Sequence, residues 1–108
     1  MESEILNEMH RSMIKNFLDT VILAKLRNSS PLSGYDIIGF INKKFDVFIS
    51  PGTIYAVLYS MERKGLIRGQ STEGKRLYVL TKRGTETINV VLKSEEEVQR
   101  FMRAILNV

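Results

Sequence analysis

The stretch "SPGTIYAVLYSMERKGLI", residues 50–67, decides the fold because it carries the signals of a complete helix. Ser50 suits the N-cap position and Pro51 suits the first helical position. Gly65 supplies a left-handed stop at the other end. Four apolar residues at helical spacing predict a face that packs on a core. These residues are Ile54, Val57, Leu58 and Met61.

The opposite face of this helix combines very small residues with two tyrosines and an arginine. Small residues near a helix N-terminus let the backbone approach bases, and longer donors further along reach phosphates or base edges. The free N–H groups of the N-terminus also favour a phosphate. We therefore predict a DNA recognition helix, although an ordinary amphipathic helix with chance surface tyrosines is the alternative. The predicted contacts are Ser50, Gly52, Thr53, Tyr55, Ala56, Tyr59 and Arg63.

Elements on both sides of this helix predict a winged helix-turn-helix. Upstream, residues 2–27 have a helical pattern that the polar stretch at 7–12 could break, and a second helix over 34–44 would turn Tyr35 inward. Downstream, "LIRGQST", a turn at "EGK" and "RLYVLT" indicate a β-hairpin before a last helix over 82–106. The expected fold is α+β but mostly helical, with three helices and a two-stranded wing.

The wing places two cations beside the predicted hairpin tip. Lys75 and Arg76 lie at or beside this tip, where we expect them to be free to reach the DNA backbone or an adjacent groove. Two solvated surface charges are the alternative interpretation. The net charge of +4 in the 108-residue chain also favours an anionic partner, though weakly.

The composition argues against an enzyme and against a metal protein. The chain has no cysteine and a single histidine, His10, and it lacks a phosphate-binding loop. The acidic run at 94–97 is expected to be solvated, because helical geometry spreads its carboxylates over different faces. We expect no catalytic residue, no metal and no cofactor. With no signal peptide and no membrane-length apolar run, a cytoplasmic protein without membrane contact is expected.

Three segments resemble the PadR-like transcriptional regulators. They are "LSGYDIIGFI", "ISPGTIYAVLYSMERKGLI" and "GKRLYVLTKRGTETI", within residues 17–88. The resemblance implies a homodimeric DNA-binding repressor whose DNA contacts include Ser50, Gly52, Thr53 and Tyr55. It also implies that Lys75 and Arg76 lie in the wing. The short wing, the single C-terminal helix of the family's small subclass and about a dozen extra N-terminal residues are departures.

Apolar stripes at both termini predict a dimer interface. A last helix of about 25 residues would be about 37 Å long, more than a small domain can cover. We therefore divide the chain into an N-terminal extension (1–13), a winged-helix domain (14–81) and a C-terminal dimerisation helix (82–108). Packing of the two termini on each other within one chain is the alternative. The predicted interface comprises Ile5, Met9, Ile88, Val91, Leu92, Val98, Phe101, Met102, Ile105 and Leu106.

Together these features predict a sequence-specific transcriptional regulator. We expect a repressor that binds double-stranded DNA as a homodimer at a pseudo-palindromic operator. A winged-helix module for protein–protein assembly, without specific DNA binding, is the alternative. The basic wing beside a face of small residues favours the DNA-binding hypothesis. No sequence feature identifies the operator or a small-molecule effector.

Overall fold

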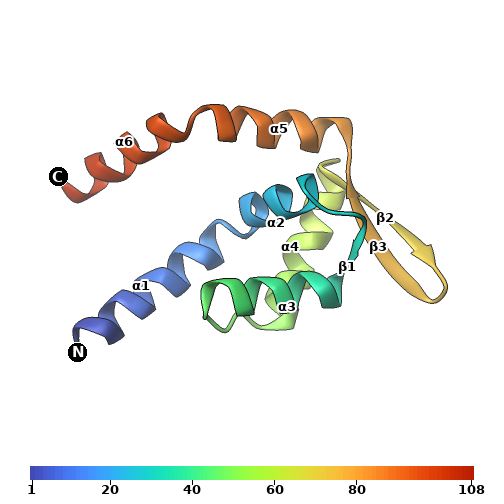
Figure 1. Ribbon diagram of the computed structural model, residues 1–108, viewed down its shortest axis with the longest axis horizontal. Coiled ribbons are helices and arrows are strands. Elements are labelled where there is room, and N and C mark those ends of the chain that lie inside the picture. Colours follow the sequence, from blue (N-terminus) through green and yellow to red (C-terminus); the bar gives the residue numbers. More distant parts are fainter.

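Helices α2, α3 and α4 pack together beside a small sheet, and two helical arms extend from this body (Figure 1). The computed structural model describes all residues, 1–108. One arm is α1, and the other is formed by α5 and α6, so both termini lie away from the hairpin. The elements are α1 (Glu2–Asn16), α2 (Leu18–Arg27), β1 (Leu32–Ser33), α3 (Gly34–Phe45), α4 (Pro51–Arg63), β2 (Ile67–Thr72), β3 (Lys75–Leu80), α5 (Lys82–Lys93) and α6 (Glu95–Leu106). The predicted winged helix-turn-helix is confirmed.

The core lies where α2, α3, α4, the hairpin and α5 meet. On α4 the predicted apolar stripe faces this core: Ile54, Leu58 and Met61 are buried and Val57 is half-buried. Neither α1 nor α6 contributes a buried residue. The remaining core residues are Leu18, Ile22, Leu23, Leu26, Ile37, Ile41, Ile49, Ile67, Tyr78 and Ile88.

Local capping interactions begin three of the helices, as the sequence predicts. The Ser33 hydroxyl accepts from the Asp36 backbone N–H, and the Asp36 carboxylate accepts from the Ser33 N–H, which completes a capping box on α3. Ser50 and Thr81 cap α4 and α5 with their hydroxyls alone, which accept from the Thr53 and Gly84 N–H groups. Gly65, with a φ of 75°, ends the turn after α4 in the left-handed region. The sequence signals for these boundaries are therefore confirmed.

The side chain of Asn42 holds the connection between α3 and α4 with two hydrogen bonds. The Asn42 amide oxygen accepts from the Ile49 N–H at 2.9 Å, and its amide nitrogen donates to the Ile49 carbonyl at 3.3 Å. Ile49 itself is buried in the core. The residue that precedes the N-cap of α4 is thus held by both hydrogen bonds and packing, and this fixes where α4 begins.

The sheet has three antiparallel strands in the order β1-β3-β2. Strands β2 and β3 form the wing, joined by Glu73 and Gly74, both at positive φ, as a two-residue turn requires. Strand β1 is not among the elements that the sequence predicts. It is only two residues long, and its pairing of Leu32 with Tyr78 depends on a partner 46 positions later, so no local pattern marks it.

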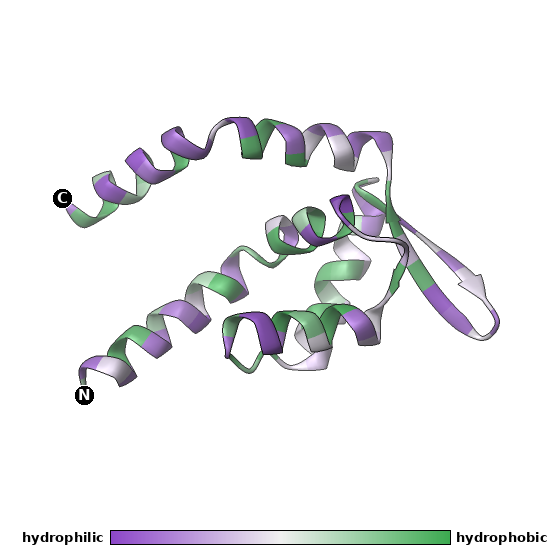
Figure 2. Ribbon diagram, viewed as in Figure 1, coloured by the Kyte–Doolittle hydropathy of each residue, from purple (hydrophilic) through white to green (hydrophobic).

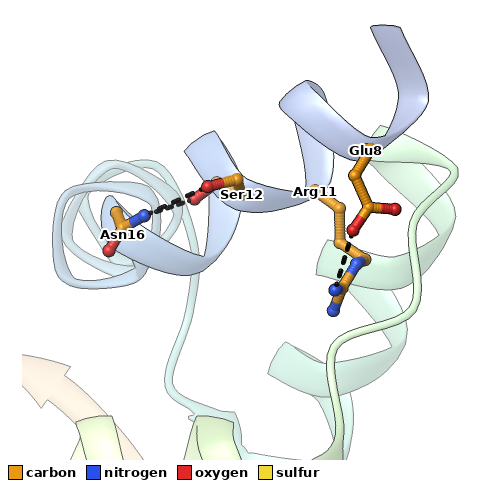
Figure 3. A network of polar contacts seen from close by, with 4 residues as sticks. All are labelled: Glu8, Arg11, Ser12 and Asn16. Carbon is orange, nitrogen blue, oxygen red and sulfur yellow. Dashed lines mark hydrogen bonds and ion pairs between the residues drawn. The ribbon is translucent and has the colours of Figure 1, made fainter. Parts of the chain in front are cut away.

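Three other details of the prediction are wrong. The N-terminal helix continues through residues 7–12 and breaks at Phe17 instead. Polar residues do not interrupt α1 because it buries no side chain, and an Arg11–Glu8 pair and hydrogen bonds from Asn16 to Ser12 follow its surface (Figure 3). The last helix is broken in two at Ser94. Tyr35, expected to point inward, is 81% exposed.

Both arms are amphipathic, and hydrophobic and hydrophilic residues alternate along their ribbons (Figure 2). None of the helices combines the length and the apolar character that crossing a membrane requires.

Candidate nucleic-acid interface

The face of α4 that points away from the core carries the predicted DNA contacts. Gly52, Ala56 and Arg63 are exposed, Tyr55 is 47% exposed and Tyr59 is 66% exposed. Thr53 is half-buried at the edge of this face, and Ser50 is exposed just before it. Gly52, Tyr55, Ala56, Tyr59 and Arg63 therefore lie on the accessible side of α4, while Thr53 lies at its edge, beside Val57 of the apolar stripe.

The N-terminus of α4 is open to an approaching backbone. A Cβ added at Gly52 would meet no atom within 4 Å. Beside it, the Ser50 hydroxyl accepts from the Thr53 N–H at 3.2 Å and lies 2.8 Å from the Thr53 hydroxyl. Thr53 N–H donates to the Ser50 hydroxyl, Ile54 N–H donates to the Ser50 carbonyl, and Pro51 has no N–H, so the first turn offers a phosphate oxygen the Gly52 N–H and the positive dipole end.

Two tyrosines on this face differ in their surroundings. The Tyr55 ring packs on Gly34 at the start of α3, with its Cε1 2.4 Å from the position of a Cβ at residue 34. Tyr59 lies one turn further along and stacks with Arg63, whose guanidinium carbon is 5.7 Å from the ring centroid. Tyr55 is therefore held against the body, whereas Tyr59 and Arg63 form a pair that extends into solvent.

The two cations of the wing are not equivalent, which corrects the expectation that both are free. Lys75 begins β3 beside the turn and is exposed. Arg76 instead pairs with Glu62 of α4, and its guanidinium carbon lies 6.0 Å from the centroid of the Tyr78 ring. The Arg76 side chain runs across the hairpin to reach Glu62, and the residues next to Arg76 in the sequence do not indicate this contact. Only Lys75 matches the description of a free cation.

A hollow of about 560 Å³ lies between α4 and the wing, beside the Glu62–Arg76 pair that joins them. Burial raises the pKa of the Tyr78 phenol in its wall, with the charge of Arg76 acting in the opposite direction, so the phenol is neutral and can donate. Sequence reasoning missed Glu62 and Tyr78 as part of this surface. The hollow is lined by Tyr55, Tyr59, Glu62, Arg63, Arg76 and Tyr78.

One signal for these contacts was present in the sequence. Gly69 lies inside β2, and a glycine within a strand often marks the close approach of another group. Here the approaching group is the Arg76 side chain. No comparable signal marks Glu62, because an acidic residue on a helix surface is most often only solvated.

The predicted dimer residues divide into two groups. Ile88 is wholly buried in the core of its own chain, so its assignment to a dimer interface is wrong. Val91 is half-buried and packs against the same core. The others lie on accessible arm surfaces, with Phe101 71% and Ile5 62% exposed. The remaining members are Met9, Leu92, Val98, Met102, Ile105 and Leu106.

An apolar hollow of about 640 Å³ runs along α6. Phe17, at the break between α1 and α2, forms one side of it, and Val98, Phe101, Met102 and Ile105 form the other. Both helical breaks, at Phe17 and Ser94, border this hollow. The structure contains no group of three or more potential metal ligands.

Comparisons with known proteins match the family and the fold. The family model for the transcriptional regulator PadR-like family matches residues 22–90, from α2 to α5. No curated protein matches the chain significantly.

Several solved structures resemble the chain. A PadR-like transcriptional regulator from Bacillus cereus has a TM-score of 0.71 at 25% identity, over 90% of this chain and 98% of that one. A PadR family regulator from Clostridium difficile has a TM-score of 0.69 at 27% identity, over 83% and 98% respectively. Bacillus subtilis PadR in complex with operator DNA has a TM-score of 0.62 at 28% identity, over 69% of this chain and 46% of that one.

Proposed function

The chain belongs to the PadR-like family of transcriptional regulators, and from that membership we propose that it is a cytoplasmic repressor that binds a pseudo-palindromic operator as a homodimer. The family consists of regulators, which agrees with the prediction that the chain is not an enzyme. Bacillus subtilis PadR, solved with operator DNA, is the related structure that supports DNA as the partner.

The observation that carries this proposal is the orientation of α4. Its buried stripe fixes the helix on the core, and its outer face presents Gly52 and Ala56 near the N-terminus and Tyr59 and Arg63 further along. We propose that α4 enters a major groove with this face toward the bases. The small residues permit close approach, while Tyr59 and Arg63 donate to base edges or phosphates.

The wing supplies a second contact in this proposal. The exposed Lys75 lies on the strand that follows the turn, and the pairing of Thr72 with Lys75 places it at the free end of the hairpin. A flexible ammonium at that position suits a phosphate of the DNA backbone better than a base edge. Lys75 is therefore proposed to strengthen binding without reading sequence.

The arms are proposed to join two chains. The apolar residues of α6 and the exposed Ile5 and Met9 of α1 are left uncovered within one chain, and gathered exposed apolar residues of this kind mark interaction surfaces. Burying them in a two-fold dimer would place two α4 helices about one helical turn of DNA, or a multiple of it, apart. In this proposal residues 1–13 form the extension, 14–81 the DNA-binding domain and 82–108 the dimerisation segment.

A protein–protein assembly module is the rival hypothesis, and a salt titration separates the two. We expect binding to a random duplex to weaken steeply with salt, with a log–log slope near the number of phosphates contacted. Selection from a pool of randomised duplexes of about 30 base pairs, three helical turns, should then yield a two-fold symmetric sequence. A wild-type protein that shows neither salt-dependent binding nor sequence selection would support the assembly module.

A further inference from the structure

The wing is tied to the recognition helix by one carboxylate, and this contact has a consequence for DNA binding. We propose that Glu62 and Arg76 form a clamp that fixes the wing against α4, and that Arg76 is a positioning residue and not a DNA contact. The inference rests on the proposed function, because the position of a wing matters only if the wing and α4 bind one duplex together.

A single oxygen of Glu62 holds both strands of the wing. Glu62 Oε2 lies 2.5 Å from Arg76 Nη2, on β3, and accepts from the backbone N–H of Gly69, on β2, at 3.3 Å. Both contacts originate from the last turn of α4. The hairpin therefore cannot tilt away from α4 unless both of these contacts break.

Gly69 makes this arrangement geometrically feasible. It pairs with Tyr78, whereas Arg76 pairs with Ser71, so the Arg76 side chain crosses the hairpin diagonally to reach Glu62. A Cβ at Gly69 would lie 2.5 Å from Arg76 Nε and 2.8 Å from Cζ. Any other residue at position 69 would therefore displace the guanidinium from this route.

Stability alone does not explain the clamp. The Glu62 and Arg76 side chains remain 29% and 47% exposed, and ion pairs as accessible as this contribute little to folding. A carboxylate beside a DNA-binding face also repels phosphates, so Glu62 weakens association through its charge alone. Glu62 can therefore favour DNA binding only by positioning another part of the protein. That part is the wing, which carries Lys75 at its free end.

The inference is tested by whether the removal of one negative charge strengthens or weakens DNA binding. Glu62→Gln and Glu73→Gln each remove one negative charge, from the clamp and from the exposed wing turn respectively. If Glu62 acted only through its charge, both variants would bind DNA more tightly. The clamp predicts instead that Glu73→Gln strengthens binding slightly, whereas Glu62→Gln weakens it on the order of five- to tenfold, the effect of loosening a backbone contact. The probes are a duplex of about 30 base pairs that the wild type selects and a random duplex of equal length.

A charge-neutral variant supplies an independent test. Gly69→Ala should displace the flexible end of Arg76 without strain elsewhere, because Gly69 does not have a positive φ. Its binding should fall by a similar factor to that of Glu62→Gln. Combining Gly69→Ala with Glu62→Gln should add little, since each substitution breaks the same contact.

Salt dependence distinguishes positioning from direct contact. Lys75→Met should lower the log–log salt slope by about one, the loss of one phosphate contact, whereas Arg76→Met should weaken binding with the slope unchanged. In the free protein, hydrogen exchange of the residue 69 amide should be faster in Glu62→Ala than in the wild type, because alanine removes the acceptor of that N–H, whereas glutamine keeps an amide oxygen in its place.

Two results would overturn the clamp: Glu62→Gln binding as tightly as Glu73→Gln, or Arg76→Met lowering the salt slope by about one. Failure of the proposed function looks different. In that case the wild type selects no sequence and shows no salt dependence, and the exchange rate at residue 69 alone decides whether the clamp exists. Unchanged exchange in Glu62→Ala would then reject it.

Discussion

The ring of Tyr55 on α4 lies directly over Gly34 at the first turn of α3, so that a Cβ at residue 34 would fall 2.4 Å from Tyr55 Cε1 and 2.8 Å from its hydroxyl oxygen. Gly34 is buried beneath the ring. The start of α3 thus determines where one tyrosine of the proposed DNA surface can lie. This contact joins the two helices of the helix-turn-helix on the side that is proposed to face DNA.

Gly34→Ala should weaken DNA binding while leaving the protein folded. The added methyl group must displace the Tyr55 ring, and alanine is at least as good a helix former as glycine, so the helix itself gains. Affinity for a selected duplex should fall by about 1–3 kcal/mol, the effect of misplacing one contact. Fluorescence anisotropy with a labelled duplex measures it. Gly39→Ala is the matched control, because position 39 on the same helix has open space around it.

Arg63→Ala should reduce DNA affinity by about 1–3 kcal/mol, because its guanidinium is exposed and is proposed to reach a base edge or phosphate. Tyr55→Phe, which removes only a hydroxyl from the same face, should act in the same direction. The apolar stripe is untouched in both variants, so their melting temperatures should stay near that of the wild type. Wild-type affinity in both, with stability intact, would show that α4 does not present this face to DNA.

Leu58→Ala should destabilise the protein. Leu58 lies on the side of α4 opposite to the proposed DNA-binding face and is fully buried there. Truncating a fully buried leucine costs about 2–5 kcal/mol of unfolding free energy. Urea titration at one fixed protein concentration measures it, because a dimer's stability depends on concentration. Val90→Ala, at a position 64% exposed on α5, should change the value by less than about 0.5 kcal/mol. A neutral Leu58→Ala would contradict the buried orientation of this residue.

The capping box of α3 should make stability sensitive to acid. Hydrogen bonds from the Ser33 backbone N–H and from its side chain lower the pKa of Asp36 below its ordinary value of 3.8. A carboxyl with a lowered folded-state pKa stabilises the fold above 3.8, and this contribution disappears as the pH falls through the lower, folded-state value. The difference in unfolding free energy between wild type and Asp36→Asn should therefore become smaller as the pH falls below 3.8 and through the lower, folded-state pKa of Asp36. A constant difference across the acid range would contradict this role of the charge.

Helix boundaries could be predicted from sequence because their causes are local. Ser50, Thr81 and Gly65 act on backbone groups within a few residues, so the same short stretch that contains the signal also contains its effect. The orientation of α4 followed for the same reason, since Ile54 and Leu58 repeat at helical spacing. These two facts were sufficient to predict the fold class and the face proposed to bind DNA.

Contacts between distant segments could not be predicted in this way. Arg76 appears in the sequence as one of two adjacent cations, and only the folded hairpin shows that it turns back to Glu62, 14 positions away. Ile88 fits the periodicity of an arm residue equally well, yet α5 packs on α2 and buries it. Periodicity identifies an apolar face but not the partner that covers it. That partner depends on how the helices are arranged, which the pattern of one helix does not contain.

The arms provide the last prediction, which concerns assembly. Phe101 and Ile105 lie four residues apart on α6, are 71% and 52% exposed, and line the hollow beside Phe17. A single recognition helix contacts too few bases to select a site in a genome, so operator binding should require two linked copies. Placing charge on this surface should separate them, because a buried unpaired carboxylate is strongly unfavourable.

Phe101→Glu combined with Ile105→Glu should therefore sediment as a monomer, with the circular dichroism of a folded winged helix, because α6 contributes nothing to the core. Its affinity for the selected duplex should fall toward the value for random DNA. Gln99→Glu with Arg103→Gln is the matched control, since it makes the same change in net charge at exposed positions on the opposite side of α6. That control should remain a dimer with wild-type affinity. If the Phe101 and Ile105 variant also remains a dimer and binds normally, the two chains associate through another surface, and α6 does not form the interface.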